Sequence, residues 1–417
     1  MIDRLLFDKT VLPNGITIYS KPVDVEFAHV RIYVPIGNRN ATSEILPGTP
    51  HILEHMTVNR SSRFPELDSF DYWVVMNGGY NNALINDRRI KYVLDIPSVD
   101  FKTGFEGLFS MAFDPLLLEA DLLNEIEVIK SEEKRESRWF PANNELSFHV
   151  YTKWKFDYPI TLRQIYGEKN DHELLTIDHI RHLHQYYFNS NVYVVIAGNF
   201  DFGLVTKELS RLRVGAQDLP IEFRELRWEN REYHEVFFPQ TQIRRFIYHL
   251  GGVFDSSDPQ VFMAINFIGK LLTNSANGTL YRWLRNELGW TYNMGFGNSV
   301  NYPYPSDWEL WLPCNTYEQS MEIRKQLKER IEASISDQAT VDQEIKRGLA
   351  GEVFWYQTLK KIIDAAERSL SSYGRIYTES EVRELLLKCH DLDFLRRIYE
   401  RYFTGEAVGE FLAMPES

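Results

Sequence analysis

The chain has 417 residues, of which 44% are hydrophobic and 25% are charged, which is enough for two or three domains with separate cores. Its formal net charge of −13 argues against nucleic acid as the main partner, because phosphate binding requires a basic face. No uncharged apolar stretch reaches the roughly 18 residues of a membrane-spanning helix, so no membrane span is expected. The first ten residues include acidic side chains and no long apolar run, unlike a secretory signal, so we expect a cytoplasmic protein. The two cysteines, Cys314 and Cys389, are too few for a disulfide framework.

The first 200 residues alternate between strand-like and helix-like segments. Asn14-Gly15 lies between two strand-like runs and predicts a hairpin turn, because both turn positions favour positive φ. In residues 29–34, valine and isoleucine alternate with polar side chains at the period of a half-buried strand, and residues 90–96 show the same alternation. The run VYVVIAGNF predicts a buried strand that ends at Gly198.

The pattern starts again in the second half of the chain. Residues 212–226 have no clear periodicity and are the predicted domain boundary, and residues 243–252 then resemble the strand at 29–34. Asp258-Pro259 predicts a helix start, with a capping carboxylate followed by proline at the first helical position. We therefore predict an α+β fold with two similar domains, residues 1–215 and 216–417, each a mainly antiparallel sheet packed with helices.

The segment GTPHILEHM, residues 48–56, contains the first candidate site. In a helix, His51 and His55 lie one turn apart on one face, where two imidazoles can share a tetrahedral Zn²⁺. Glu54 is placed to reach the remaining open position and to take a proton from water there. This His-x-x-Glu-His order is the inverzincin pattern. The alternative is that the two histidines only occupy the polar face of a surface helix.

A catalytic zinc site needs a third protein ligand, and the sequence offers several candidates downstream. The segment NEIEVIKSEEKRESRWFP has helical apolar spacing and places Glu125 and Glu132 two turns apart on one face. Spacing does not choose between these two, nor does it exclude Glu133 or Glu136. The alternative is that all these glutamates merely solvate a helix.

Together these segments resemble the pitrilysin/insulinase family of zinc peptidases, which includes mitochondrial processing peptidase and half-length bacterial members. The resemblance implies that Glu132 is the third ligand of one Zn²⁺ per chain and that Glu125 orients a ligand from the second shell of the metal. It also implies that the chain is half of a clamshell. A second chain, identical or related, would then complete a chamber for peptide substrates.

Two further segments are similar to family segments that bind substrate. In GGYNNALIND, the resemblance assigns Gly79, Asn82 and Ala83 to a strand edge where a peptide adds as an extra strand. In YRWLRNELGWTY, it assigns Arg285 and Tyr292 to substrate binding and to stabilising the oxyanion formed at the scissile carbonyl.

The expected function is therefore a zinc-dependent endopeptidase that cleaves peptides or unfolded segments inside a chamber, with Glu54 as general base. The alternatives are a non-catalytic peptide-binding or structural subunit of a heterodimeric peptidase, and a structural zinc protein. A structural site would be closed by a fourth ligand and would not need Glu54. Pro50, and Ile85 where the family usually has threonine, depart from the common pattern and leave the sub-branch and substrate open.

Two other sequence features allow more than one interpretation. His179 and His182 could share a helix face and bind a second metal, but no carboxylate ligands accompany them, so a polar helix face is the favoured interpretation. The glycine-containing stretch NMGFG, residues 293–297, is consistent with either a substrate-facing loop or a plain turn.

Overall fold

A computed structural model describes residues 3–40, 45–86, 88–139, 165–189, 191–215, 233–238, 243–255, 257–299, 306–404 and 408–416. The chain divides into two compact units. Residues 6–137 and 165–215 lie in one, called here the N-terminal domain, and residues 3–5 and 233–416 lie in the other, the C-terminal domain. The predicted boundary near residues 212–226 falls largely outside the described residues.

The N-terminal domain is built on a six-stranded sheet with the order β1-β2-β6-β3-β5-β4. All neighbours are antiparallel except β2 and β6, which are parallel. The strands are β1 (Asp8–Val11), β2 (Thr17–Pro22), β3 (Phe27–Val34), β4 (Tyr80–Ile85), β5 (Ile90–Pro97) and β6 (Tyr193–Gly198).

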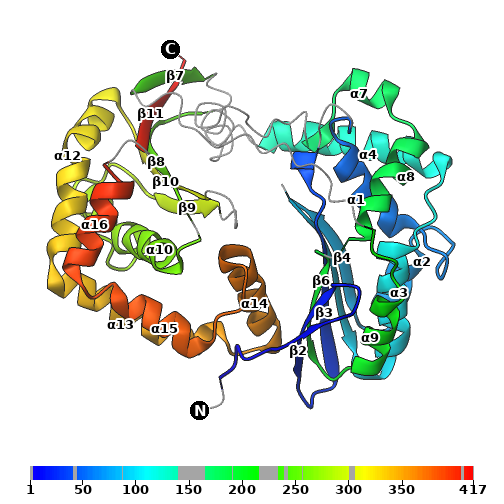
Figure 1. Ribbon diagram of the computed structural model, residues 1–417. Coiled ribbons are helices and arrows are strands. Elements are labelled where there is room, and N and C mark those ends of the chain that lie inside the picture. Colours follow the sequence, from blue (N-terminus) through cyan, green and yellow to red (C-terminus); the bar gives the residue numbers. More distant parts are fainter. Residues whose placement is uncertain are drawn as a thin grey trace. The chain divides into compact units, whose positions relative to one another are not determined.

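Helices cover one face of this sheet (Figure 1) and enclose a core of isoleucine, valine, leucine and phenylalanine side chains. The helices are α1 (Thr49–Asn59), α2 (Ser69–Met76), α3 (Phe101–Phe113), α4 (Glu119–Trp139), α7 (Lys169–Leu174), α8 (Ile177–His184) and α9 (Phe202–Ser210). Three short 3₁₀ turns accompany them: η1 (Asn38–Asn40), η2 (Ser98–Asp100) and η3 (Gln185–Tyr187).

The strand predictions are confirmed with one correction. A turn at Pro13-Asn14-Gly15 joins β1 and β2, as predicted, but only Gly15 has positive φ, at 90°, and Asn14 does not. The strand that ends at Gly198 is present. The expectation that β3 is half-buried is wrong, because its polar face is buried too: Arg31 is only 2% exposed. The carboxylate of Asp95, on the neighbouring strand β5, explains this burial, since it pairs with Arg31 and with His29, each at 2.7 Å.

The C-terminal domain has a five-stranded sheet with the order β7-β11-β8-β10-β9. Only β11 and β7 are parallel neighbours. The strands are β7 (His234–Phe238), β8 (Phe246–Phe254), β9 (Gly295–Ser299), β10 (Ser306–Cys314) and β11 (Val408–Pro415).

Helices α10, α12 and α16 pack on this sheet, and side chains of α11, η4 and α13 extend the same core. Figure 1 shows the helices of this domain. They are α10 (Pro259–Thr273), α11 (Thr279–Tyr281), the π-helical η4 (Arg282–Glu287), α12 (Tyr317–Ser336), α13 (Gln338–Trp355), α14 (Leu359–Tyr373), α15 (Glu379–Lys388) and α16 (Leu392–Tyr402). The predicted helix start is confirmed, since the Asp258 carboxylate caps α10 by accepting from the Gln260 N–H at 2.8 Å. None of the described helices is both long and apolar enough to cross a membrane.

The two sheets share one plan. Strands β2, β6, β3, β5 and β4 take the same order as β7, β11, β8, β10 and β9, and the parallel pair falls at the same place in each. In both domains a helix follows the central strand and precedes the edge strand in the sequence: α1 comes between β3 and β4, and α10 between β8 and β9. The predicted α+β fold with two similar domains is therefore confirmed.

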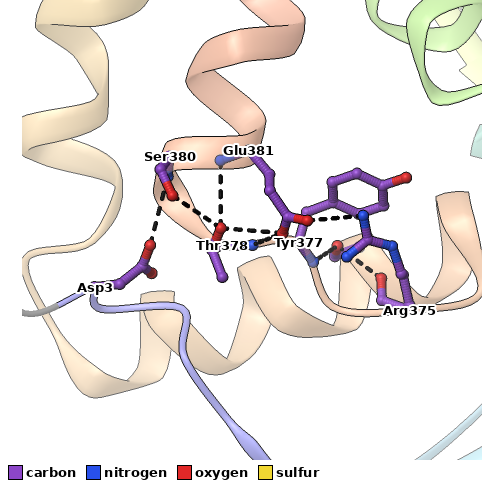
Figure 2. Close-up of polar contacts among 7 residues, drawn as sticks. Asp3, Arg375, Tyr377, Thr378, Ser380 and Glu381 are labelled. Carbon is purple, nitrogen blue, oxygen red and sulfur yellow. Dashed lines mark hydrogen bonds and ion pairs between the residues drawn. The ribbon is translucent and has the colours of Figure 1, made fainter.

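The start of the described chain packs on the C-terminal domain although it precedes β1. Figure 2 shows Asp3 at the first turn of α15, where its carboxylate accepts from the main-chain N–H groups of Glu379 at 3.1 Å and Ser380 at 3.4 Å. Arg4 adds an ion pair with Glu379 at 2.7 Å. Because helix N-terminal N–H groups lack partners within the helix, this segment satisfies donors that would otherwise depend on water.

The same turn of α15 also carries a capping box. Thr378 Oγ1 accepts from the Glu381 N–H at 3.3 Å, and the Glu381 carboxylate accepts from the Thr378 N–H at 2.8 Å. Arg375 donates to the other Glu381 oxygen at 2.8 Å (Figure 2). The N-terminal segment therefore binds a helix end that is already ordered by its own side chains.

The Asp95 carboxylate predicts an acid-sensitive contribution to stability. Burial raises the pKa of Asp95, but its bonds to His29 and Arg31 outweigh burial and lower it well below the usual value. A group with a lowered folded-state pKa stabilises the fold above its unfolded pKa of about 3.9, and this contribution is lost as the pH falls further.

We expect Asp95→Asn to destabilise the protein by about 2–4 kcal/mol at pH 7, since it leaves the buried Arg31 guanidinium without its carboxylate. Thermal unfolding of the unchanged protein and the variant from pH 7 to pH 3 measures this loss. The difference in unfolding temperature between the two should narrow below about pH 4. Asp8→Asn, at an exposed position of β1, is the matched control. A difference that stays constant down to pH 3 would contradict the assignment.

Candidate metal centre

Helix α1 carries both candidate histidines and begins at a constrained turn. Gly48 precedes the helix with φ 80°, and Pro50 occupies its first turn, where the missing N–H costs nothing. A Cβ at Gly48 would lie 2.7 Å from the main chain of Tyr166 and Gly167. Only glycine satisfies both the positive φ and this close approach, so Gly48 fixes where α1 starts.

The structure brings His51, His55 and Glu132 together. Their ligand atoms all lie within 4.8 Å of one another, and Glu132 Oε2 is 3.8 Å from Nε2 of each histidine. The rings of His51 and His55 meet edge-on with centroids 4.9 Å apart. Among the glutamates that spacing left open, Glu132 is therefore the one that approaches Nε2 of both histidines. The side chain of Glu136 lies outside the described residues.

These three side chains fit a zinc ion. Zinc bonds to histidine nitrogen and carboxylate oxygen are about 2.0–2.2 Å long, so tetrahedral ligand atoms lie roughly 3.3–3.6 Å apart, close to the 3.8 Å seen between these atoms. Burial and the neighbouring His55 lower the pKa of His51 to about 4, so its imidazole is neutral at pH 7. Neutral imidazole is the form that binds metal.

Glu125 lies behind His55. Its Oε2 accepts from His55 Nδ1 at 2.9 Å, and its Oε1 accepts from the Asn59 amide at 2.8 Å. Burial raises the pKa of Glu125, but these two hydrogen bonds outweigh it and lower the pKa. A carboxylate on Nδ1 leaves Nε2 of His55 as the acceptor nitrogen, turned toward Glu132.

Glu54 lies beside the cluster on the same helix. Its Oε2 is 3.8 Å from His55 Nε2, and the residue is only 7% exposed. Burial raises the pKa of Glu54 to about 7; His55 opposes this, and Glu132 and Glu125 add to it. Such a carboxyl group next to a three-ligand cluster is placed to exchange protons with water at the fourth position.

The predicted substrate strand lies next to α1. Asn82 and Ala83 belong to β4, which has β5 as its single neighbour in the described sheet and packs against α1. Gly79 precedes β4, and a Cβ there would lie 2.7 Å from the Asp95 carbonyl oxygen. The three residues thus follow one exposed sheet edge beside the helix that carries His51 and His55.

Arg285 and Tyr292 lie together in the C-terminal domain. The Arg285 guanidinium stacks over the Tyr292 ring, 4.2 Å from its centroid, and donates to the Tyr292 carbonyl at 3.3 Å. Arg285 belongs to the π-helical turn η4, and the Tyr292 side chain is 71% exposed.

The expectation of a loop or turn at residues 293–297 needs correction, because residues 295–297 begin strand β9.

The histidines at 179 and 182 do not gather a metal cluster within the described part of the chain. His179 Nδ1 accepts from the Thr176 N–H at 3.1 Å and so caps its own helix α8, while His182 packs edge-on against Tyr186. Sequence reasoning missed Asn59, which bonds Glu125. The signal was its position, four residues after His55 on the same helical face.

Two models of one protein family match this chain. The profile described as insulinase (peptidase family M16) matches residues 17–146, and that described as the peptidase M16 inactive domain matches residues 175–342. The chain belongs to the insulinase family. The predicted resemblance is therefore confirmed, and the His51–His55–Glu132 cluster lies within the first matched segment.

Individual relatives in the insulinase family match over shorter segments. Human nardilysin is 29% identical over 92 residues, which is 22% of this chain and 8% of nardilysin. Insulin-degrading enzyme-like 2 of Arabidopsis thaliana is 30% identical over 132 residues, 31% of this chain and 14% of the relative. The matched segments thus span less than a fifth of these relatives' own length.

The fold is shared over the whole chain. The crystal structure of a protease from Helicobacter pylori aligns with a TM-score of 0.84 at 17% identity, and covers 98% of this chain and 99% of that one. At this identity the likeness establishes the fold alone.

The turn at Gly48 predicts a specific defect. Gly48→Ala should destabilise the protein by roughly 2 kcal/mol or more from the positive φ and the main-chain clash together, and should weaken zinc binding because the start of α1 must shift. Gly78→Ala is the matched control, since Gly78 has φ 74° with nothing within 4 Å of an added Cβ. Zinc affinity by chelator competition and thermal unfolding of both variants measure the effects. Equal zinc affinity in the two variants would contradict the role of the turn.

Proposed function

We propose that the chain is a zinc-dependent endopeptidase that hydrolyses peptides or unfolded polypeptide segments. The observation that carries the proposal is Glu54, a buried carboxyl group 3.8 Å from Nε2 of His55, beside the His51–His55–Glu132 cluster. A structural zinc site is closed by four protein ligands and has no use for a neighbouring acid–base group. The family membership supports the same conclusion, as does the cluster of three, and not four, candidate ligands among the described residues.

His51, His55 and Glu132 would hold the metal. Zinc at this position would supply a Lewis acid that polarises a peptide carbonyl and makes water more acidic. Glu54 removes a proton from the attacking water as its oxygen bonds to the carbonyl carbon. When the C–N bond breaks, Glu54 returns that proton to the leaving amine. Glu125 keeps His55 in the tautomer that presents Nε2.

The alternative, a non-catalytic peptide-binding or structural subunit, gains support from the match to the inactive-domain profile. That match covers residues 175–342, whereas His51, Glu54 and Glu132 lie in the segment that matches the insulinase profile. The inactive-domain match therefore covers a part of the chain that carries none of these three side chains. The full set in the first half favours the catalytic role.

Substrate would add to the sheet at β4. A peptide in extended conformation would pair with the free edge near Gly79, Asn82 and Ala83, and its main-chain hydrogen bonds would bind without strong sequence preference. Because β4 packs against α1, a peptide on this edge would lie beside the cluster. This mode of binding selects flexible segments, since a folded protein rarely offers a free extended strand.

A second chain would complete the site. We take Arg285 and Tyr292 of one chain to bind the substrate held at the zinc of another, with the Tyr292 hydroxyl donating to the developing oxyanion. The 71% exposure of Tyr292 leaves its ring available for such a contact. The partner would be an identical or a related chain, each contributing half of a clamshell around the substrate.

The general base can be tested separately from the metal. Glu54→Gln should lower the rate of cleavage of a quenched fluorescent peptide library by about 10²–10⁴-fold, since the amide cannot accept the proton. Zinc content by elemental analysis should stay at one per chain, because Glu54 is not a ligand. A chelator should abolish the activity of the unchanged protein, and added zinc should restore it. Cleavage by Glu54→Gln at the original rate would overturn the assignment.

The shared site predicts complementation between two inactive variants. Glu54→Gln and Arg285→Ala proteins should each be nearly inactive alone. When the two are mixed, unfolded and refolded together, up to about a quarter of the original activity should return, because about half of the dimers are mixed and each mixed dimer has one intact site of two. Sedimentation of the same samples measures the assembly. No recovery in a mixture that forms dimers would show that each site is built from a single chain.

A further inference from the structure

Asn59 is the last residue of α1 and is 8% exposed. It follows His51 and His55 at the same four-residue interval, so the three side chains project from one face of the helix. Its Nδ2 lies 2.8 Å from Glu125 Oε1, while the other carboxylate oxygen of Glu125 lies 2.9 Å from His55 Nδ1. Each oxygen of Glu125 therefore has its own donor on α1.

We propose that Asn59 is a positioning residue for the metal centre: its amide holds the Glu125 carboxylate in the orientation that bonds His55 Nδ1. This inference rests on the proposed zinc site and adds to it a residue that neither the motif nor its spacing assigns. Asn59 touches neither the cluster nor its open position, so its influence passes through Glu125 to His55.

The donor chemistry explains the choice of side chain. An ionised carboxylate only accepts hydrogen bonds, so a largely covered one is stabilised by a donor on each oxygen. The Glu125 side chain is 13% exposed, and both its oxygens have such a donor. The Asn59 amide supplies that donor without adding a positive charge, which would compete electrostatically with a cation at the cluster. A lysine here would pair with Glu125 more strongly and weaken its hold on His55.

A second bond near Asn59 fixes how the two helices lie against each other. Arg60, the residue after α1, donates through Nε to Asp121 Oδ2 at 2.9 Å, and Asp121 lies four residues before Glu125 on α4. The two helices are thus antiparallel: His51, near the start of α1, contacts Glu132, and Arg60, after its end, contacts Asp121 near the start of α4. The bond from Asn59 to Glu125 lies between the Arg60–Asp121 ion pair and the candidate ligands.

The experiment measures zinc affinity of the full-length chain by competition with a chromophoric chelator. Asn59→Leu removes the donor at similar volume and should weaken zinc binding about tenfold, within the range typical of residues behind metal ligands. Asn59→Asp should weaken it further, since it places a second carboxylate against Glu125. If Asn59→Leu does not fold, Asn59→Ser, which is too short to reach Glu125, gives the same comparison.

Two controls separate positioning from general stability. Asn77→Leu removes another amide bond in the same domain, from Asn77 Nδ2 to the Trp73 carbonyl at 2.8 Å, and should lower thermal stability without changing zinc affinity. Because Asn59 acts through Glu125, its effect should disappear in the Glu125→Ala background.

Two results would overturn the inference. One is a zinc affinity of folded Asn59→Leu within twofold of the unchanged protein, and the other is an undiminished effect of Asn59→Leu in Glu125→Ala. If the unchanged protein binds no zinc, the proposed function fails instead, which is a different and distinguishable outcome.

Discussion

The antiparallel contact between α1 and α4 is the constraint on which the rest of the site depends. His51 and His55 are fixed relative to each other by the helix itself, since four residues make about one turn. Glu132 reaches them only if α4 lies at one particular register along α1. Two polar contacts further along the helix pair set that register: Glu125 with His55, and Asp121 with Arg60.

The sheet holds this helix pair in place. Helix α1 packs against edge strand β4 and against α3, so the metal cluster and the exposed strand edge are parts of one packed unit. The turn at Gly48 fixes the start of α1, and the close approach of Gly79 to the Asp95 carbonyl fixes the start of β4. The closeness of the candidate ligands on α1 to the edge of β4 therefore follows from the core of the N-terminal domain.

Much of this arrangement was predictable from local patterns. The helical spacing of His51 and His55, the turn at Asn14-Gly15 and the cap at Asp258 each depend on neighbours in the chain. All three are present, although Asn14 lacks the positive φ that the turn prediction required. The choice among the downstream glutamates was not predictable from spacing, because it depends on the register of α4 against α1. Family resemblance supplied Glu132 where periodicity alone left four candidates.

Other misses have the same origin in distant contacts. The polar face of β3 looked exposed, yet Arg31 is buried because Asp95 lies beside it on β5, sixty-four residues along the chain. The packing of Asp3 on α15 joins residues more than 370 positions apart, and no local pattern marks it. The position of Asn59, four residues after His55, places it on the same helical face. Its bond to Glu125 depends on the packing of α4 and so could not be predicted from the sequence.

The second domain shows why the same plan gathers the candidate metal ligands in one domain of the described chain and not in both. Helix α10 lies between β8 and β9 as α1 lies between β3 and β4, and it too packs against the edge strand. Where α1 carries His51 and His55, α10 presents Ile265, Ile268 and Leu272 to the core. An apolar face stabilises its domain by burial, whereas His51, His55 and Asn59 on the polar face of α1 need Glu125 and Glu132 of α4 as partners. Within its described residues, the C-terminal domain thus has the same scaffold without a comparable His/Glu cluster. Its exposed Tyr292, with Arg285 stacked on the ring, is the feature to which the proposed function assigns substrate binding.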